Sequence, residues 1–298
     1  MTGKRNDGVK PRLMEVPNPF ALEPGTVRVL ESAEGFGNEQ FEQLRDGRFG
    51  RPFIIDHERT RNLFFSLSSI QSSMRLDDPD ALIAAYTRKM MAFLLFNPAP
   101  RHVLMLGLGG GSLAKFCYRH LPSTRITVVE ISAEVIALRD EFAIPPDDDR
   151  FEIVHDDGAA YLAGGNLQPD IIMIDAFDET GVSPTLAAPG VYRSASRALT
   201  PEGILVMNLS GEKSRYPAHV ESLREAFPGM IRLVTVEEGE NVVLFAFKQR
   251  RAAALPDSLK RRAASLERGL GLDFSLYLER LRAGETLTAR GHSADPTR

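Results

Sequence analysis

The chain has 298 residues, 43% of them hydrophobic, which suits one large domain or a large domain with a smaller companion. Its formal net charge of -4 gives no overall basic field, so we expect no nucleic-acid partner. The single cysteine, Cys117, cannot form an internal disulfide, and no Cys/His cluster has zinc-ligand spacing, so we expect no metal.

The start of the chain carries no recognisable targeting segment. Its first twenty residues, MTGKRNDGVKPRLMEVPNPF, lack the apolar centre of a secretory signal, and no run of about 18 apolar residues occurs anywhere. We therefore predict a cytoplasmic protein that does not engage a membrane. Residues 1–24 are polar and punctuated by proline, which predicts a flexible N-terminal arm.

Residues 25–78 are predicted to form a small antiparallel β domain. The segments TVRVLES, FEQL, RPFIIDH and NLFFSLSS are short, rich in β-branched and aromatic residues, and separated by Gly, Asp and Arg clusters. The next segment, DDPDALIAAYTRKMMAFLLF, begins with Asp and Pro and continues in good helix formers. It predicts a buried linking helix.

Residues 79–249 are predicted to form a Rossmann-like α/β domain with a doubly wound, mostly parallel sheet. Helical segments separate the strands HVLMLGL, RITVVEI, FEIVH, DIIMIDA and GILVMNL, as in right-handed βαβ crossovers. The last two strands flank EEGEN, a gap too short for a crossover helix, so the final strand should be antiparallel. Residues 250–298 are predicted to be a helical, partly flexible tail.

Residues with functional chemistry follow the predicted parallel strands, at the sheet edge where ligands bind. The first strand ends in Gly107-Leu108-Gly109-Gly110-Gly111, and the next three end in Glu130, Asp157 and Asp175. The glycines permit close backbone approach, and the following helix offers free N–H groups. Glu130 is placed to accept hydrogen bonds from two ribose hydroxyls.

The glycine loop alone leaves three ligand classes open: a triphosphate, a dinucleotide and a sulfonium nucleoside. The GxxxxGK[ST] pattern of a triphosphate loop is absent, and Ser112 stands where the dinucleotide fingerprint has a glycine. Three acidic strand ends would also repel the phosphates of a dinucleotide. The combination favours a cationic sulfonium nucleoside without phosphates.

The segment from about Val27 to Lys248 resembles the spermidine synthase-like aminopropyltransferases, within the class I S-adenosylmethionine-dependent methyltransferase-like superfamily. The resemblance is carried by VLES, Gln71, Tyr86, the glycine loop, VVEI, DDG and the D-x-x-D of Asp175 and Asp178. It implies transfer of an aminopropyl group from decarboxylated S-adenosylmethionine to an amine acceptor, with release of methylthioadenosine. It also implies a homodimer.

The resemblance also implies a role for each matched residue. Asp175 is similar to the base that deprotonates the attacking amine. Substrate binding is implied for Asp178, Tyr86 and Gln71, and donor binding for Gly107, Gly109, Gly111, Glu130 and Asp157. The carboxylate of the family's usual GGGDGG loop is replaced here by Gly110.

Other interpretations of these residues stay open. The missing loop aspartate favours a methyltransferase that uses S-adenosylmethionine itself, and a non-catalytic nucleoside-binding protein or a dehydrogenase are further alternatives. Structural roles are also open: packing for Gly109, Gly111 and Tyr86, helix capping for Glu130 and Asp157, sheet hydrogen bonding for Gln71 and an ordinary loop charge for Asp178.

Overall fold

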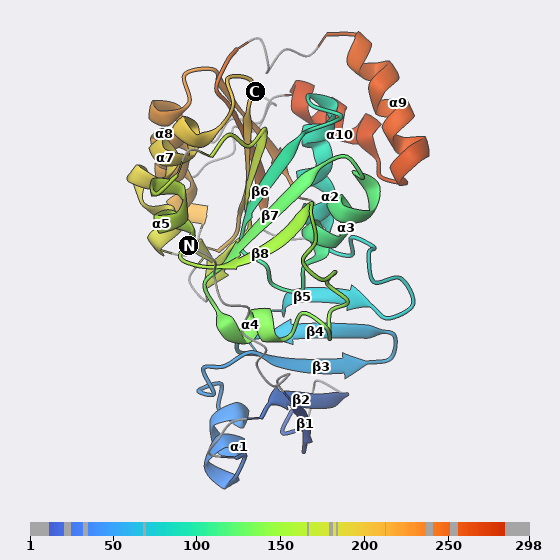
Figure 1. The fold of residues 1–298 in the computed structure, drawn as a ribbon, viewed down its shortest axis with the longest axis vertical. Helices are drawn as coiled ribbons and strands as arrows, with labels where there is room; N and C mark the ends of the chain where they lie inside the picture. Colours follow the sequence, from blue (N-terminus) through green and yellow to red (C-terminus); the bar gives the residue numbers. More distant parts are fainter. Residues whose placement is uncertain are drawn as a thin grey trace, which may run out of the picture.

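The computed structural model describes residues 12–20, 25–31, 35–67, 70–165, 167–178, 181–182, 184–211, 213–236, 241–250 and 256–283. In these ranges a small antiparallel sheet lies at one end of a larger, mostly parallel sheet that has helices on both faces (Figure 1). None of the described helices is both long and apolar enough to span a bilayer.

The small sheet is a five-stranded antiparallel meander in the order β1-β2-β3-β4-β5. A stack of aromatic rings forms its core, with the ring centroids of Phe53 and Phe64 5.4 Å apart. The helix α1 connects β2 to β3. The bounds are β1 Leu13–Val16, β2 Thr26–Leu30, α1 Asn38–Arg45, β3 Phe53–His57, β4 Thr60–Phe64 and β5 Ile70–Arg75.

Two predictions for this region are wrong. Residues 13–16, assigned to the flexible arm, form the edge strand β1, because Val16 is buried and the strand pairs in register with β2. The segment FEQL, expected to be a strand, lies in α1, where Gln40 caps the first turn and Leu44 is buried. Short segments of this kind are compatible with either a strand or a helix. Here the hydrogen bond between Gly37 N and the Gln40 side chain favours the helix.

The large sheet has the strand order β13-β14-β12-β9-β6-β7-β8. Strands β6 to β9 and β12 are parallel, whereas β14 is antiparallel to both of its neighbours, as predicted from the short EEGEN gap. The bounds are β6 His102–Leu106, β7 Arg125–Glu130, β8 Phe151–His155, β9 Ile171–Ile174, β12 Ile204–Leu209, β13 Met230–Thr235 and β14 Val242–Phe247.

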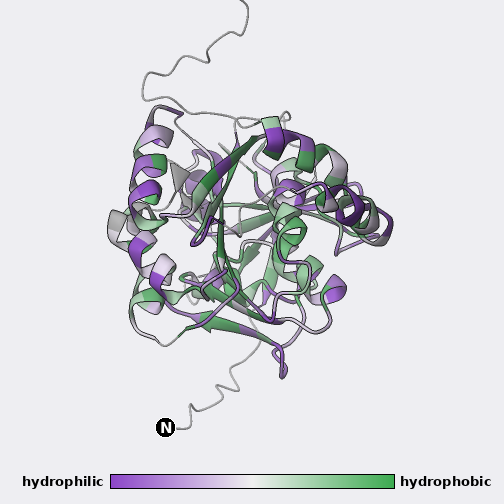
Figure 2. Ribbon diagram, turned by 90° about the horizontal axis from the view of Figure 1, so that it is seen from above, coloured by the Kyte–Doolittle hydropathy of each residue, from purple (hydrophilic) through white to green (hydrophobic). Residues whose placement is uncertain are grey.

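Helices cover both faces of this sheet, so its inner strands β9, β12 and β14 are buried along their whole length and are mostly hydrophobic (Figure 2). One face packs against α5, α7 and α8, and the other against α2, α3, α9 and α10 (Figure 1). The helical bounds are α2 Ala85–Met90, η1 Met91–Leu95, α3 Ser112–His120, α4 Ala133–Ala137, α5 Gly158–Ala163, α6 Pro184–Ala187, α7 Pro189–Ala198, η2 Lys213–Arg215, α8 Tyr216–Ala226, α9 Ser258–Leu270 and α10 Phe274–Ala283; β10 Phe177–Asp178 and β11 Gly181–Val182 form a small hairpin.

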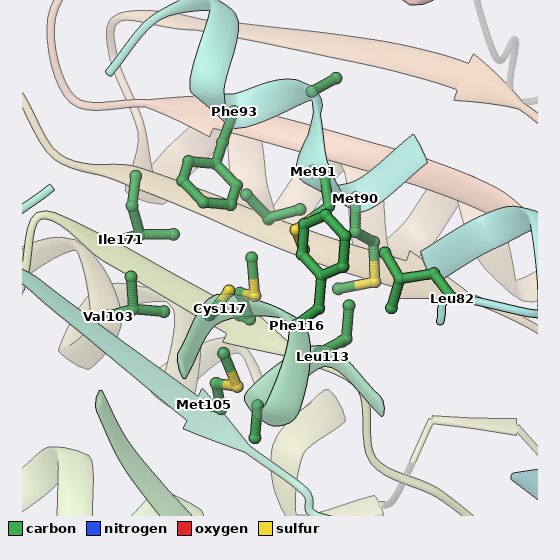
Figure 3. Close-up of a cluster of buried hydrophobic side chains, with 14 of the residues drawn as sticks. Leu82, Met90, Met91, Phe93, Val103, Met105, Leu113, Phe116, Cys117 and Ile171 are labelled. Atoms are coloured by element: carbon green, nitrogen blue, oxygen red, sulfur yellow. The ribbon is translucent and has the colours of Figure 1, made fainter. Parts of the chain in front are cut away.

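The linking helix is shorter than predicted. It begins at Ala85 rather than near Asp77: Ala84 O accepts the first helical N–H groups, from Thr87 and Arg88, whereas Leu82 O accepts from the Arg88 side chain at 3.1 Å instead of from a helical N–H. The MMAFLLF run is buried, as expected. It packs with residues of α3, β6 and β9 in the cluster of Figure 3, which includes Cys117. The five-stranded sheet spans residues 13–75, and the seven-stranded sheet and the β10–β11 hairpin lie within residues 102–247. The division at residue 79 into two domains stays a prediction.

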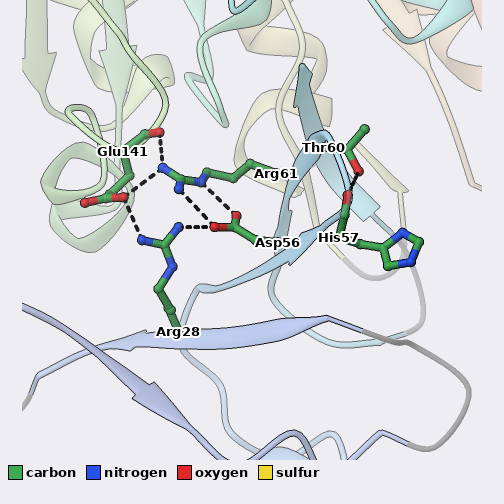
Figure 4. Close-up of polar contacts among 6 residues, drawn as sticks. All are labelled: Arg28, Asp56, His57, Thr60, Arg61 and Glu141. Atoms are coloured by element: carbon green, nitrogen blue, oxygen red, sulfur yellow. Dashed lines mark hydrogen bonds and ion pairs between the residues drawn. The ribbon is translucent and has the colours of Figure 1, made fainter. Parts of the chain in front are cut away.

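Ion pairs join the small sheet to the loop that follows α4 (Figure 4). Arg61 on β4 forms two hydrogen bonds to the carboxylate of Asp56, at 2.8 and 3.0 Å, and reaches the Glu141 carboxylate at 2.8 Å. Arg28 on β2 also pairs with both Asp56 and Glu141. The side chain of Arg61 is only 14% exposed. We therefore expect this network to contribute more to the free energy of unfolding than an ion pair at the surface does.

We expect Arg61→Met to lower the free energy of unfolding by about 2 kcal/mol, since it leaves Asp56 and Glu141 with one cation fewer. Urea denaturation measures this loss. The matched control is Arg59→Met, because the Arg59 side chain is 83% exposed and pairs with Asp77 at the surface. We expect this variant to lower the free energy of unfolding by less than about 0.5 kcal/mol. Equal losses in the two variants would contradict the role given to this network.

Candidate active site

A cavity of about 470 Å³ opens at the carboxyl ends of β6, β7 and β9, where β5 of the small sheet faces them. This is the sheet edge at which the sequence predicted a ligand. The predicted site residues that line it are Gln71, Tyr86, Gly107, Gly109, Glu130, Asp157 and Asp175. The structure therefore brings together side chains from both sheets.

One predicted and described residue, Gly111, does not line the cavity. It caps α3 in a left-handed conformation, and a Cβ there would lie 2.6 Å from Ile144, so it serves the packing role left open above. Asp178 lies in the β10–β11 hairpin, and its side chain falls outside the described residues.

The glycine loop needs glycine at Gly107 for a steric reason. This residue has φ +101°, and a Cβ would lie 2.4 Å from the backbone oxygen of Asp175. The neighbouring strand end therefore touches the loop directly. Because a side chain would force the two apart, Gly107 sets how close the loop and Asp175 lie.

Glu130, at the end of β7, holds the glycine loop in place by a hydrogen bond to its backbone. Its Oε2 accepts a hydrogen bond from Leu108 N at 2.8 Å and its Oε1 accepts one from Ser132 N at 2.8 Å. The residue is 8% exposed yet lines the cavity. Each carboxylate oxygen has capacity for one more hydrogen bond, so Glu130 combines a structural role with free acceptor capacity for a ligand.

Ile131 is a site residue that the sequence reasoning passed over. It is 63% exposed, an unusual degree for a large apolar side chain, and it lines the cavity beside Glu130. An apolar ligand surface lying on it would remove this exposed area from water. The sequence feature that could have indicated this residue is its position directly after Glu130, the acidic residue at the strand end.

Asp157 caps α5, which is the structural role that the sequence left open. Its Oδ1 accepts hydrogen bonds from Ala159 N at 2.8 Å and Ala160 N at 2.9 Å. The same residue lines the cavity, and both cap hydrogen bonds are accepted by Oδ1. The cap therefore fixes the side chain while Oδ2 keeps its acceptor capacity.

Asp175, directly after β9, is held by two neutral donors. Tyr86 Oη donates to its Oδ2 at 3.2 Å, and Asn208 Nδ2 donates to its Oδ1 at 3.1 Å. Burial raises the pKa of Asp175 to about 6, although both hydrogen bonds oppose the shift. Burial and the adjacent Asp175 together raise the pKa of Tyr86 well above its usual value. Asp175 can thus exchange a proton near neutral pH, and Tyr86 stays a donor.

Gly110, where the family has an aspartate, faces the small sheet at close quarters. A Cβ at this position would lie 2.6 Å from Ser72 Oγ and 2.9 Å from Phe142 Cδ1. The hydroxyls of Ser72 and Ser112 lie 3.5 Å apart, and both residues line the cavity. This corner of the cavity is therefore lined by neutral hydroxyl groups.

The cavity has no positively charged lining and no apparent metal site. Within the ranges that the structure describes, no Lys, Arg or His lines it, and no group of three or more His, Cys, Asp or Glu side chains is arranged to hold a metal ion. The polar side chains of the described lining that a cationic ligand would meet are carboxylates, amides and hydroxyls. The acidic character that the sequence suggested for this edge of the sheet is what the carboxylates create.

We expect Asp175→Asn to raise stability at pH 7 by about 1–2 kcal/mol. The folded pKa of about 6 lies above the usual 3.8, so ionising this buried group destabilises the fold as the pH rises from 3.8 to 6. Urea denaturation at pH 7 and pH 4.5 measures the effect, and the gain should shrink at the lower pH. Asp157→Ala, which removes a helix cap, should instead cost about 1 kcal/mol. A destabilised Asp175→Asn at pH 7 contradicts the raised pKa.

Comparisons with known proteins agree with this geometry. The spermine/spermidine synthase domain family matches residues 83–222. The polyamine aminopropyltransferase of Chromobacterium violaceum is 37% identical over 80% of this chain and 92% of its own, and that of Neisseria meningitidis serogroup A is 36% identical over 82% and 94%. The structure of spermidine synthase from Thermotoga maritima has a TM-score of 0.61 with 17% identity, covering 78% of this chain and 81% of that one, and shares the fold. The chain belongs to the polyamine aminopropyltransferase family.

Proposed function

We propose that this protein moves an aminopropyl group from decarboxylated S-adenosylmethionine to an amine acceptor and releases methylthioadenosine. The observation that carries the proposal is the position and the raised pKa of the Asp175 carboxyl group. Its carboxylate lies in a cavity without cations, beside the glycine loop, and its pKa of about 6 suits a group that accepts a proton near neutral pH.

The nucleoside part of the donor would lie along the ends of β6 and β7. We propose that the free acceptor capacity of Glu130 takes the two ribose hydroxyls, and that the adenine lies on the exposed side chain of Ile131 with its amino group toward Asp157. Gly107 and Gly109 leave room for the donor against the loop backbone. Supporting this placement, all five residues line one cavity.

The transfer step assigns a simple task to Asp175. An ammonium group has no lone pair, so the acceptor must lose a proton before its nitrogen can attack. Asp175 takes that proton. The amine nitrogen then bonds to the aminopropyl carbon beside the sulfonium, the carbon–sulfur bond breaks, and its electron pair stays on sulfur in methylthioadenosine.

The acceptor amine would lie between Asp175 and the small sheet. Tyr86 and Gln71 line that side of the cavity, and we propose that they orient the acceptor with Asp178 of the adjacent hairpin. Holding the amine beside the donor carbon lowers the entropic part of the barrier. The surrounding carboxylates also offset the positive charge of both substrates.

One observation favours a second candidate, a methyltransferase that uses S-adenosylmethionine itself. Ser72 and Phe142 fill the space beside Gly110, so the glycine loop presents no carboxylate to the donor tail. A neutral corner repels the α-carboxylate of S-adenosylmethionine less than an aspartate would. The two donors therefore have to be compared directly. A homodimer, a cytoplasmic location and the absence of a nucleic-acid partner stay predictions.

We expect purified protein supplied with decarboxylated S-adenosylmethionine to convert an amine to its aminopropyl product. Mass spectrometry identifies the product across a panel that contains putrescine, cadaverine and spermidine. Asp175→Asn should lower the rate by about 10²-fold or more, since a positioned base contributes that much. Full activity in this variant would remove Asp175 from its role, and methylated product alone would replace the proposed function with the second candidate.

Donor choice has its own test, calorimetry of each donor without an amine acceptor, in the Asp175→Asn background that slows turnover. We expect the decarboxylated donor to bind at least as tightly as S-adenosylmethionine. Adding Glu130→Gln should weaken both donors about tenfold or more, because the new amide group opposes the N–H donors of Leu108 and Ser132 and loses acceptors for the ribose. A clear preference for the carboxylated donor would contradict aminopropyl transfer.

A further inference from the structure

A chain of hydrogen bonds runs from the last strand of the large sheet to Asp175. Asn241, just before β14, donates from its Nδ2 to Asn208 Oδ1 at 2.9 Å. Asn208 on β12 donates in turn from its Nδ2 to Asp175 Oδ1 at 3.1 Å. Asn208 is 1% exposed and does not line the cavity, so it reaches substrate only through Asp175.

The direction of this chain matters because an amide has one donor end and one acceptor end. With Asn241 donating to its oxygen, the amide of Asn208 presents its N–H to Asp175. If the amide turned over, its oxygen would face the oxygen of Asp175, and only a protonated carboxyl could bridge the two. Asn241 therefore selects the amide orientation that suits the ionised carboxylate.

Among the described residues, two side chains stabilise the ionised form of Asp175 by hydrogen bonds: Tyr86 from α2 and Asn208 from β12. The other ionisable side chains of the described lining of the cavity, apart from Tyr86, are the carboxylates Glu130 and Asp157. No Lys, Arg or His of the described ranges lines it. Two neutral hydrogen bonds thus oppose the burial of the charge, and the loss of either leaves the anion with a single donor.

We propose that Asn208 and Asn241 are positioning residues, which hold Asp175 in its proton-accepting form and aim its second oxygen, together with Tyr86, toward the acceptor amine. The inference rests on the proposed function, in which Asp175 is the base. Asn208 acts by direct contact with Asp175. Asn241 acts one step further away, by fixing the orientation of the Asn208 amide.

The test compares wild type with Asn208→Leu, which is close to isosteric, and with Asn241→Ala at a partly exposed position. Asn97→Ala is the matched control, because the Asn97 side chain accepts a hydrogen bond from Ala99 N in its own loop and has no bond to Asp175. Carboxyl ¹³C NMR titration follows Asp175, whose signal is assigned by its loss in Asp175→Asn. The pH dependence of kcat/KM is measured on the same proteins.

We expect the pKa of Asp175 to rise by about one unit in Asn208→Leu, the size of a lost hydrogen bond to a charged group. The rise should be smaller in Asn241→Ala and absent in Asn97→Ala. From a starting pKa of about 6, a one-unit rise makes kcat/KM about fivefold lower at pH 6 and nearly equal to wild type at pH 8.

Unchanged titration of Asp175 in both network variants would overturn the inference, whatever the activity of the protein. An equal loss of kcat/KM at pH 6 and pH 8 would overturn it too, since that pattern marks general damage to the fold. A raised pKa in a protein that aminopropylates no amine would support the positioning role and contradict the proposed function. The two claims can therefore fail separately.

Discussion

The structure of the site depends on one constraint, a carboxylate buried where no cation offsets it. Asp175 follows a strand that is hydrophobic throughout, and it enters a cavity that no Lys, Arg or His of the described ranges lines. Within the described part of the chain, its charge is supported by hydrogen bonds from Tyr86 and Asn208. The cost of that burial keeps the pKa near neutrality, which is the property a base needs.

Both sheets are required to assemble this environment. The large sheet supplies the glycine loop, Glu130 and Asp175, while β5 of the small sheet closes the cavity with Gln71 and Ser72. The ion pairs of Arg28 and Arg61 with Glu141 attach the small sheet to the loop that follows α4 and precedes β8 of the large sheet. The same loop carries Phe142, which packs beside Gly110. The contacts that join the sheets therefore also shape the corner of the cavity assigned to the donor.

Much of this architecture could be predicted from the sequence, because strands that alternate with helices and end in Gly107, Glu130 and Asp175 specify both the sheet and its binding edge. The EEGEN gap likewise indicated the antiparallel final strand. Local capping was harder to predict: FEQL forms part of α1, and the linking helix begins only at Ala85, where Ala84 O accepts the first helical N–H groups and Leu82 O bonds to the Arg88 side chain. The helix α8 received no prediction.

The residues that tune the site were out of reach of sequence reasoning. Asn208 and Asn241 are 33 positions apart and meet only because β14 pairs with β12, so no local pattern links them to Asp175. The crowding at Gly110 likewise depends on Ser72 from the other sheet. Spacing along the chain predicts which residues reach the sheet edge, whereas their orientation and proton affinity depend on neighbours from other strands.

The central claim is that Asp175 accepts the proton of an amine held beside a donor nucleoside. A crystal structure with methylthioadenosine and an amine acceptor bound tests it most directly. The account predicts the ribose hydroxyls on Glu130 and the amine nitrogen about 2.6–3.2 Å from a carboxylate oxygen of Asp175. An amine bound away from Asp175, or a nucleoside that does not contact Glu130, would contradict it.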